Sequence, residues 1–280
     1  MKNALTIDLE DYYHVQAFAN IVDKQTWDTY ESRVEKNTHT LLDLFDPFSV
    51  KCTFFVLGWE ARRNPKLIRE VADRGHEIAS HGMSHKLVYT QSQQVFREET
   101  RDSKALLEDI AQKPVIGYRA ATYSITRESL WAVDILHELG FQYDSSIFPI
   151  RHDNYGIPDA YPLPNRMSTP MGNKITEFPI SVFRYKGFKL PVSGGGYFRL
   201  LPYGLTKRAL RHINNSGDEF VFYLHPWEVD PDQPRMENAS LLSKFRHYCN
   251  LGKTEARLRT LLADFSFTTM QDVLLAKGLL

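Results

Sequence analysis

The sequence is organised around residues 75–85, which read Gly75-His76-Glu77-Ile78-Ala79-Ser80-His81-Gly82-Met83-Ser84-His85. A short apolar run over residues 76–80 predicts a β-strand that delivers His81 at its C-terminal end. His81 and His85 are four residues apart, and two imidazoles at that spacing can lie on one face of a helical turn and bind one metal ion. A surface pair without a ligand is the commoner meaning of such spacing, so the surrounding chain has to distinguish the two.

Strand-like and helical patterns alternate along the chain. Strands are predicted over residues 4–9, 52–57, 76–80, 114–118, 141–143, 175–180, 197–200, 219–224 and 265–268. Helices are predicted over residues 37–45, with Asn37 or Thr38 as N-cap, and over 65–74, 93–112, 127–139, 239–249 and 254–263, with others after Pro202 and at the C-terminal end. Residues 145–173 show no period of 2 or 3.6, and we expect them to form an irregular wall over the substrate.

Reactive side chains lie at or just past the C-terminal ends of different predicted strands. They are Asp8, His81, Arg119, Asp144 and His225. A βα-barrel builds its active site at this end of its strands, so these side chains are expected to converge at one mouth. The alternation and this placement together predict a single α/β domain with a parallel barrel sheet.

Composition excludes several classes of protein. The 280 residues contain 34 Lys plus Arg and 34 Asp plus Glu, which leaves no net charge to attract nucleic acid. No apolar stretch is long enough for a signal peptide or a membrane span, so we expect a cytoplasmic protein without a transmembrane segment. Cys52 and Cys249 are expected to be free thiols.

The first predicted strand ends in a group of carboxylates, Asp8, Glu10 and Asp11. If the strand stays extended, Asp8 and Glu10 point to the same side, so that one can bind a metal while the other remains free as a base. Two histidines and one carboxylate leave a coordination position open for water, which is typical of a catalytic rather than a structural zinc site.

Five motifs stand in a fixed order along nearly the whole chain. They are Thr6-Ile7-Asp8-Leu9-Glu10-Asp11, His81-Gly82-Met83-Ser84-His85, Gly117-Tyr118-Arg119-Ala120-Ala121-Thr122-Tyr123, Tyr143-Asp144-Ser145-Ser146 and Phe222-Tyr223-Leu224-His225. In this order the chain resembles the NodB-homology polysaccharide deacetylases, carbohydrate esterase family four, and among them the branch associated with exopolysaccharide gene clusters and the exosortase system. Five ordered motifs are far more specific than any one of them.

The resemblance implies a distorted (β/α)7-type barrel over residues 1–280, with the part from about residue 229 as a family-specific extension. It implies a hydrolase that removes N-acetyl groups from an amino-sugar-containing poly- or oligosaccharide in exopolysaccharide biosynthesis and releases acetate. The cofactor would be a divalent metal, with zinc first. The partner would be an N-acetylated saccharide, with a lipid-linked intermediate as one option.

The resemblance also implies roles for individual residues. Asp8 would be the general base, His225 the general acid, His81 and His85 metal ligands, Glu10 or alternatively Asp11 the third ligand, Arg119 the group that orients the base, Asp144 a support for the charged network, and a backbone N–H near Thr122 an oxyanion donor. Three positions depart from the family pattern. Leu9 separates Asp8 from Glu10, Gly82 replaces the usual Ser or Thr, and Ala121 replaces the usual proline.

Other classes of protein fit parts of the same pattern. A metal-independent hydrolase of cyclic amides, similar to the allantoinase branch, would work without His81 and His85. A non-haem iron oxygenase also uses two histidines and a carboxylate, but it needs a co-substrate site. A non-catalytic saccharide-binding protein would need neither a base nor an acid.

Overall fold

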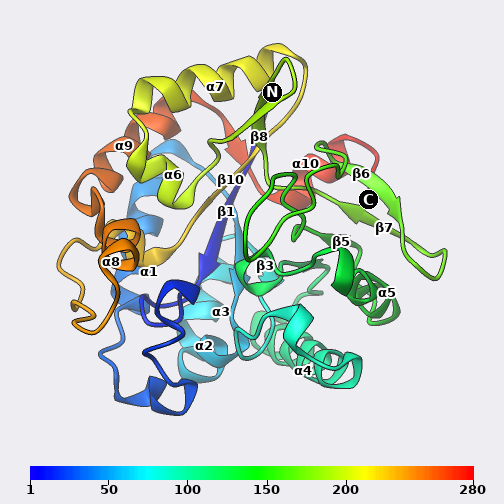
Figure 1. Cartoon of the computed structure of the whole chain (residues 1–280), viewed down its shortest axis with the longest axis horizontal. Helices are drawn as coiled ribbons and strands as arrows, with labels where there is room; N and C mark the ends of the chain where they lie inside the picture. Colours follow the sequence, from blue (N-terminus) through cyan, green and yellow to red (C-terminus); the bar gives the residue numbers. More distant parts are fainter.

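The computed structural model describes residues 1–280, and its centre is a curled sheet of parallel strands (Figure 1). The parallel strands follow one another across the sheet in the order β10 (Val221–Leu224), β1 (Asn3–Leu9), β2 (Thr53–Val56), β3 (Glu77–Ser80), β4 (Gly117–Tyr118), β5 (Tyr143–Asp144) and β7 (Lys174–Glu177). β11 (Phe267–Thr268) also pairs with β1, and β6 (Asn165–Ser168) adds an antiparallel edge to β7. The prediction of a single α/β domain with a distorted (β/α)7-type barrel is confirmed.

The distortion lies between β7 and β10, where no continuous ladder joins the strands. A single parallel bridge links Gly194 to Tyr223, and the Tyr223 N–H donates to the Ser193 carbonyl at 2.9 Å. Gly194 has φ +136°, and a Cβ there would lie 2.0 Å from the Tyr223 carbonyl oxygen. Only glycine fits this approach, so Gly194 allows the two sides of the barrel to be linked.

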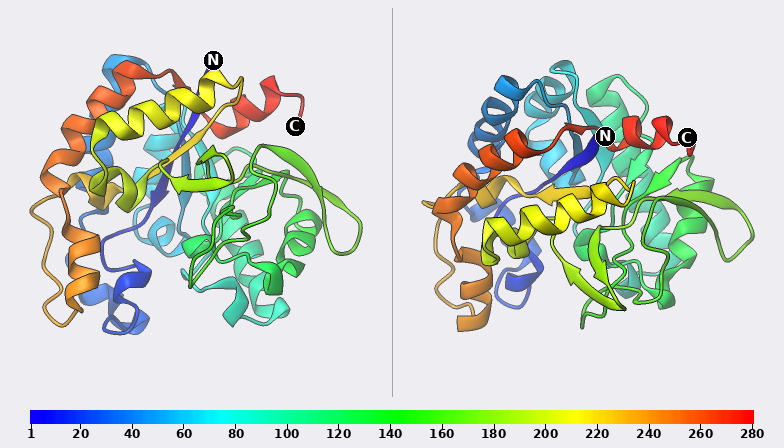
Figure 2. Two further views of the ribbon diagram at one scale, coloured as in Figure 1. Left: turned by 45° about the horizontal axis from the view of Figure 1, so that its top comes forward. Right: turned by 90° about the horizontal axis from the view of Figure 1, so that it is seen from above.

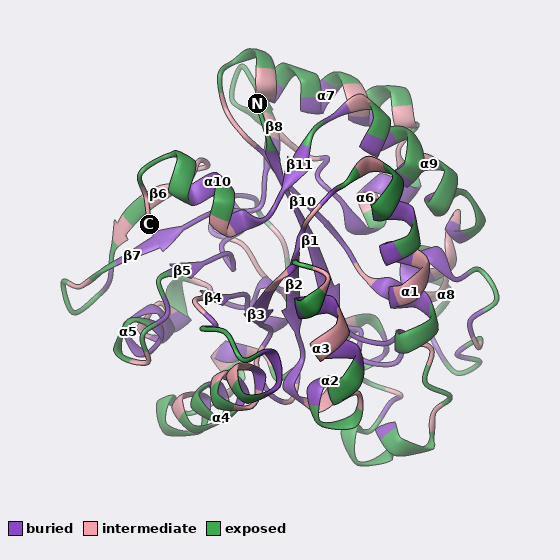
Figure 3. Ribbon diagram, turned by 180° about the vertical axis from the view of Figure 1, so that it is seen from behind, coloured by how far each residue is buried: buried purple, intermediate pink, exposed green.

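Helices surround the sheet (Figures 1 and 2). They are α1 (Val34–Phe45), α2 (Gly58–Arg63), α3 (Pro65–Asp73), α4 (Gln93–Ala111), α5 (Trp131–Glu138), α6 (Gly195–Leu200), α7 (Tyr203–Asn215), α8 (Leu241–Tyr248), α9 (Leu251–Asp264) and α10 (Met270–Ala276). A separate hairpin is formed by β8 (Val182–Tyr185) and β9 (Phe188–Pro191). Figure 3 shows buried strands inside a shell of helices whose outer faces are exposed.

The alternation of side chains along β1 separates core from site. Leu5, Ile7 and Leu9 belong to the large apolar cluster beneath the helices. Thr6 and Asp8 point to the other side, where both contact a buried arginine. This period of 2 follows from the pleat of a strand, and it directs Asp8 into the barrel mouth.

Two predicted elements were wrong. Residues 197–200, predicted as a strand, form helix α6, because the chain turns at Gly195 with φ +52° and then buries Phe198 in the core. Residues 145–173 are not wholly irregular, because Asn165–Ser168 is strand β6. This edge strand alternates between half-buried and exposed residues, so it carries no apolar signal.

Helix α1 begins at Val34, three residues before the predicted N-cap Asn37. The cap comes from a distant part of the chain, since the Asp11 carboxylate accepts from the Val34 N–H at 3.0 Å and the Arg33 N–H at 2.7 Å. Asn37 is buried inside the helix and donates to Asp230 at 3.2 Å. A cap supplied from outside the local sequence leaves no local signal.

Candidate active site

Three buried side chains converge at the mouth of the barrel. Glu10, His81 and His85 each place one ligand atom within 4.8 Å of the others. The spacing of the histidines predicted a helical turn, but the loop that carries them is not helical. Gly82 has φ +75° and His85 has φ +49°, and these left-handed conformations fold the loop after β3 back on itself.

The donor set fits a divalent metal. His81 Nδ1 lies 2.8 Å from the Arg119 carbonyl oxygen, so it carries the ring proton and leaves Nε2 as a lone pair. Glu10 Oε2 lies 2.8 Å from His85 Nε2, yet it has no hydrogen-bond partner. Burial lowers the pKa of His81 to about 4, which keeps this ring neutral. Two imidazoles and a carboxylate whose ligand atoms converge in this way suit zinc and related metals.

The neighbouring histidines determine the charge of Glu10. Burial opposes ionisation of Glu10, but the adjacent His85, with His225 and His81 farther away, holds the pKa of this carboxyl well below its usual range. Glu10 is therefore a carboxylate at neutral pH. An anionic oxygen beside the neutral His81 imidazole favours the binding of a cation.

Asp11, the alternative third ligand, lies elsewhere. Its carboxylate accepts from the N–H groups of Tyr12, Arg33 and Val34 at 2.7 to 3.0 Å, and from the Ser32 hydroxyl at 3.2 Å. These contacts cap helix α1. The structure therefore brings Glu10, and not Asp11, to the two histidines.

Asp8 lies beside this cluster and is held by Arg119. Arg119 is fully buried, and its Nη1 donates to Asp8 Oδ1 at 2.6 Å and to Thr6 Oγ1 at 2.8 Å. The guanidinium also donates to the carbonyl and hydroxyl oxygens of Ser145 and lies 4.0 Å from the ring centre of Phe55. Because these contacts fix the Arg119 guanidinium, they also fix the orientation of the Asp8 carboxylate.

Asp144 lies behind the site and does not line the cavity. Its Oδ1 accepts from the Ser146 hydroxyl at 2.5 Å, and the Ser146 hydroxyl oxygen accepts from the Ala120 N–H at 2.8 Å. Burial, with the negative charge of Asp144 beside it, raises the pKa of Glu177 well above its usual range. Asp144 anchors the backbone that leads from Arg119 to Thr122.

His225 follows β10 and faces both carboxylates of the mouth. Its Nε2 lies 3.9 Å from Asp8 Oδ2 and 3.6 Å from Glu10 Oε1. Its Nδ1 lies 2.8 Å from Glu228 Oε1. Burial opposes protonation, but the hydrogen bond and charge of Glu228, with the charges of Glu10 and Asp8, raise the pKa of His225 to about 9. His225 is therefore protonated at neutral pH.

Glu228 and Arg199 are functional residues that the sequence interpretation missed. Arg199 Nε donates to Glu228 Oε2 at 2.7 Å, and both side chains are buried. Glu228 could have been found, because it stands three residues after His225 with Pro226 between them, the spacing of a capping box that the structure forms. Arg199 lies on α6, far from any motif, and carries no such signal.

A cavity of about 230 Å³ connects these groups. Asp8, Glu10, His81, His85, Thr122 and His225 line it, together with residues outside the predicted set such as Gln16, Tyr155, Arg246 and His247. Thr122 and Tyr123 both have left-handed conformations, with φ 55° and 54°. Backbone strain of this kind collects at functional sites, and here it turns the loop after β4 toward the cavity.

Comparison with known proteins agrees with this geometry. A family model described as polysaccharide deacetylase matches residues 22–143, and a second, described as a domain of unknown function (DUF3473), matches residues 145–275. The chain is 32% identical to the peptidoglycan-N-acetylglucosamine deacetylase of Bacillus cereus over 79 residues, which is 28% of this chain and 37% of that protein. The chain thus spans little more than a third of this relative.

Solved structures extend the likeness to the whole fold. A Mycobacterium smegmatis protein proposed to be a polysaccharide deacetylase superimposes with a TM-score of 0.60 at 20% identity, over 97% of this chain and 89% of that one. The Puue allantoinase superimposes with a TM-score of 0.63 at 17% identity, over 96% and 87%. At such identities the likeness shows the fold alone. Residues 22–143 thus match the polysaccharide deacetylase family, and the five ordered motifs resemble its NodB-homology type, carbohydrate esterase family four.

Proposed function

We propose that the protein is a metal-dependent hydrolase that removes N-acetyl groups from an amino-sugar-containing poly- or oligosaccharide and releases acetate. One observation carries this proposal. A carboxylate held by a buried arginine, Asp8, and a protonated histidine, His225, face one another beside the Glu10–His81–His85 cluster in one cavity. Base, acid and cation site are the set that amide hydrolysis needs.

The chain's own groups perform the proton transfers. Asp8, fixed by Arg119, takes a proton from the attacking water, whose oxygen forms the new bond to the acetyl carbon. His225 gives its proton to the sugar nitrogen as the C–N bond breaks, so that acetate and a free amine leave. A divalent metal held by Glu10, His81 and His85, with zinc as the first expectation, would polarise the acetyl carbonyl and lower the pKa of a bound water.

The remaining predicted residues position these groups. A backbone N–H near Thr122 is proposed to donate to the oxygen that gains negative charge, because its strained loop lines the cavity. Asp144 acts through Ser146 on the same loop. The segment from about residue 229 is proposed as a family-specific extension, and it supplies Arg246 and His247 to the cavity.

A role in exopolysaccharide biosynthesis, a cytoplasmic location and a lipid-linked substrate belong to the same proposal. No helix combines the length and hydrophobicity that crossing a bilayer requires. Fractionation of cells that express the native protein tests the location, and recovery in the periplasm would overturn it.

Acetate release tests the proposed reaction. The purified protein is incubated with N-acetylated amino-sugar oligosaccharides before chelation, after chelation and after zinc is added back. Loss and recovery of acetate release support a metal-dependent deacetylase. Release that is indifferent to chelation favours the metal-independent, allantoinase-like reaction. Binding without release by the zinc-loaded protein favours a non-catalytic saccharide-binding protein.

A further inference from the structure

Helix α8 has an outer face of large apolar side chains that lies open to solvent. Leu241 is 86% exposed, and Leu242 and Phe245 are each 56% exposed. No other large apolar side chain of the protein is as exposed as Leu241. Because a helix turns once in about 3.6 residues, positions 241, 242 and 245 lie side by side. These three residues form the α8 face.

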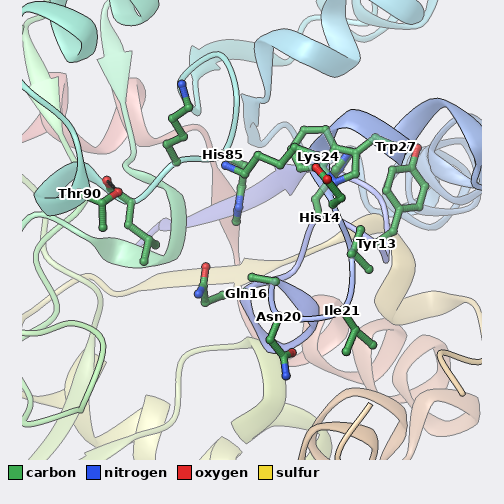
Figure 4. A pocket seen from close by; sticks show the side chains of 14 residues that line it. Tyr13, His14, Gln16, Asn20, Ile21, Lys24, Trp27, His85 and Thr90 are labelled. Atoms are coloured by element: carbon green, nitrogen blue, oxygen red, sulfur yellow. Dashed lines mark hydrogen bonds between the residues drawn. The ribbon is translucent and has the colours of Figure 1, made fainter. Parts of the chain in front are cut away.

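The opposite side of α8 packs against the active site. His247 is 3% exposed, and its ring stacks on Trp227 with 4.1 Å between the ring centres. Trp227 stacks in turn on His225 at 5.1 Å. The helix also contacts the short 3₁₀ helix Gln16–Phe18. Gln16 lines the active-site cavity, and Figure 4 shows it in the wall of the pocket beside the barrel mouth. The α8 face is therefore the outside of a helix whose inner side borders the cavity.

Positive charges flank the α8 face. The helical repeat places Lys244 on one side of the face and Arg246 on the other, and α8 contains no acidic residue. Arg246 is exposed, and Lys244 Nζ donates to the backbone carbonyl of Glu237 at 2.6 Å. The acids nearest in sequence, Asp232 and Glu237, lie in the loop before the helix, which also carries the exposed Arg235. The helix itself is cationic, in a chain that has no net charge.

This combination fits the surface of a lipid bilayer better than it fits a protein partner. A stable protein interface buries about 800 Å² on each partner, and the centre of such an interface is depleted of charge. Three side chains supply only part of that area. A helix at a bilayer surface needs only an apolar face that enters the boundary between acyl chains and headgroups, with Lys and Arg on its polar side. Anionic headgroups attract those cations.

We propose that α8 docks the protein on an anionic lipid bilayer, with the α8 face in the interface and with Lys244 and Arg246 at the headgroup phosphates. The inference concerns a surface outside the catalytic cavity, and it does not depend on the proposed deacetylase reaction. Docking through α8 holds the cavity next to the bilayer, because the inner side of the same helix borders that cavity. A saccharide carried by a lipid would then reach Asp8 and His225 at the membrane surface.

Vesicle binding tests the docking helix. A double variant, Leu241→Gln with Phe245→Gln, removes two of the three apolar side chains and no buried one. The matched control, Leu275→Gln with Phe188→Gln, replaces the same residue types on α10 and β9, where they are 51% and 60% exposed. Cosedimentation measures binding to vesicles of phosphatidylcholine alone and to vesicles in which about a third of the lipid is phosphatidylglycerol.

Wild type and the control should bind the anionic vesicles, and the double variant should bind them at least about tenfold more weakly. Lys244→Gln should lose roughly fivefold on the anionic vesicles and nothing on the neutral ones, because one cation near an anionic surface contributes about that factor. Equal binding by wild type and the double variant, or no binding by wild type, would overturn the proposal.

Two further measurements separate a bilayer from a second copy of the chain. Light scattering gives the mass in solution, and a wild-type dimer that the double variant dissociates would make the α8 face an interface between copies and refute docking. A monomer in both proteins supports docking. Phe245→Trp places a fluorophore on the face, and its emission should shift to shorter wavelength when anionic vesicles are added. Unchanged emission in the presence of these vesicles would contradict insertion.

Discussion

Glu228 Oε1 lies 2.8 Å from His225 Nδ1, while Arg199 donates to the other oxygen of the same carboxylate at 2.7 Å. These contacts fix the His225 imidazole and keep the negative charge of Glu228 beside it. The proposed acid is thus held in place by two residues, Glu228 and Arg199, that lie outside the five motifs.

The contact between His225 and Glu228 predicts an alkaline limit to activity. His225 must be protonated to donate, so kcat/KM should fall as pH rises through about 9, the raised pKa of this group. Glu228→Gln removes the charge that raises this pKa, burial then dominates, and the fall should move to lower pH by at least about one unit. The pH profiles of kcat/KM for both proteins check this. If the alkaline limb of the kcat/KM profile does not move in Glu228→Gln, a group other than His225 sets the alkaline limit.

Asp8→Asn tests the base. The amide keeps the size of the side chain and accepts from Arg119, but it cannot take a proton, so kcat should fall by about 10²- to 10⁴-fold. Affinity for the saccharide should remain, as measured by calorimetry. Asp43→Asn, an exposed aspartate on α1, serves as the control and should keep wild-type turnover. Comparable turnover in the two variants would remove Asp8 from the mechanism.

Glu10→Ala and Asp11→Ala separate the two candidate ligands. Glu10→Ala should lose bound metal, measured by mass spectrometry of the dialysed protein, because it removes the anionic donor of the cluster. Asp11→Ala should retain metal but lose about 2 kcal/mol or more of unfolding free energy, because it removes the cap of α1. The opposite pattern would make Asp11 the ligand.

Two glycine substitutions test the packing. A Cβ on Gly117 would lie 2.1 Å from the Tyr143 ring, whose hydroxyl donates to Glu77 at 2.7 Å. Gly117→Ala should therefore cost about 1–3 kcal/mol of unfolding free energy. Gly204→Ala meets nothing within 4 Å near the start of α7 and should gain up to about 1 kcal/mol. Denaturant unfolding measures both, and equal effects would show that Tyr143 moves aside.

Much of the fold could be predicted because its strands are short, mostly apolar runs that alternate with helical patterns. The buried run of β2 and the long polar-faced helix α4 lie close to their predicted bounds. Elements whose signal is not local were missed. β6 is an exposed edge, and α6 begins at a glycine turn that only the barrel closure requires.

Some residues of the candidate site could likewise be predicted from local sequence, and others could not. Asp8, His81 and His225 could be placed because each lies at or just past the C-terminal end of a strand, and strand ends converge in a barrel. The choice of Glu10 over Asp11 depends on which carboxylate the N-terminus of α1 takes, a contact made 22 residues along the chain. Arg199 reaches the site from a helix whose position only the assembled fold defines.

The pairing of β1 between β2 and β10 has a consequence for biosynthesis. Residues 4–7 leave the ribosome long before their partners at 221–224. Until then, one edge of the first strand stays unsatisfied, and the carboxylates of the mouth have no acid opposite them. The nascent chain therefore keeps an open sheet edge until β10 has been made, and the proposed acid joins the carboxylates only when these two distant strands pair.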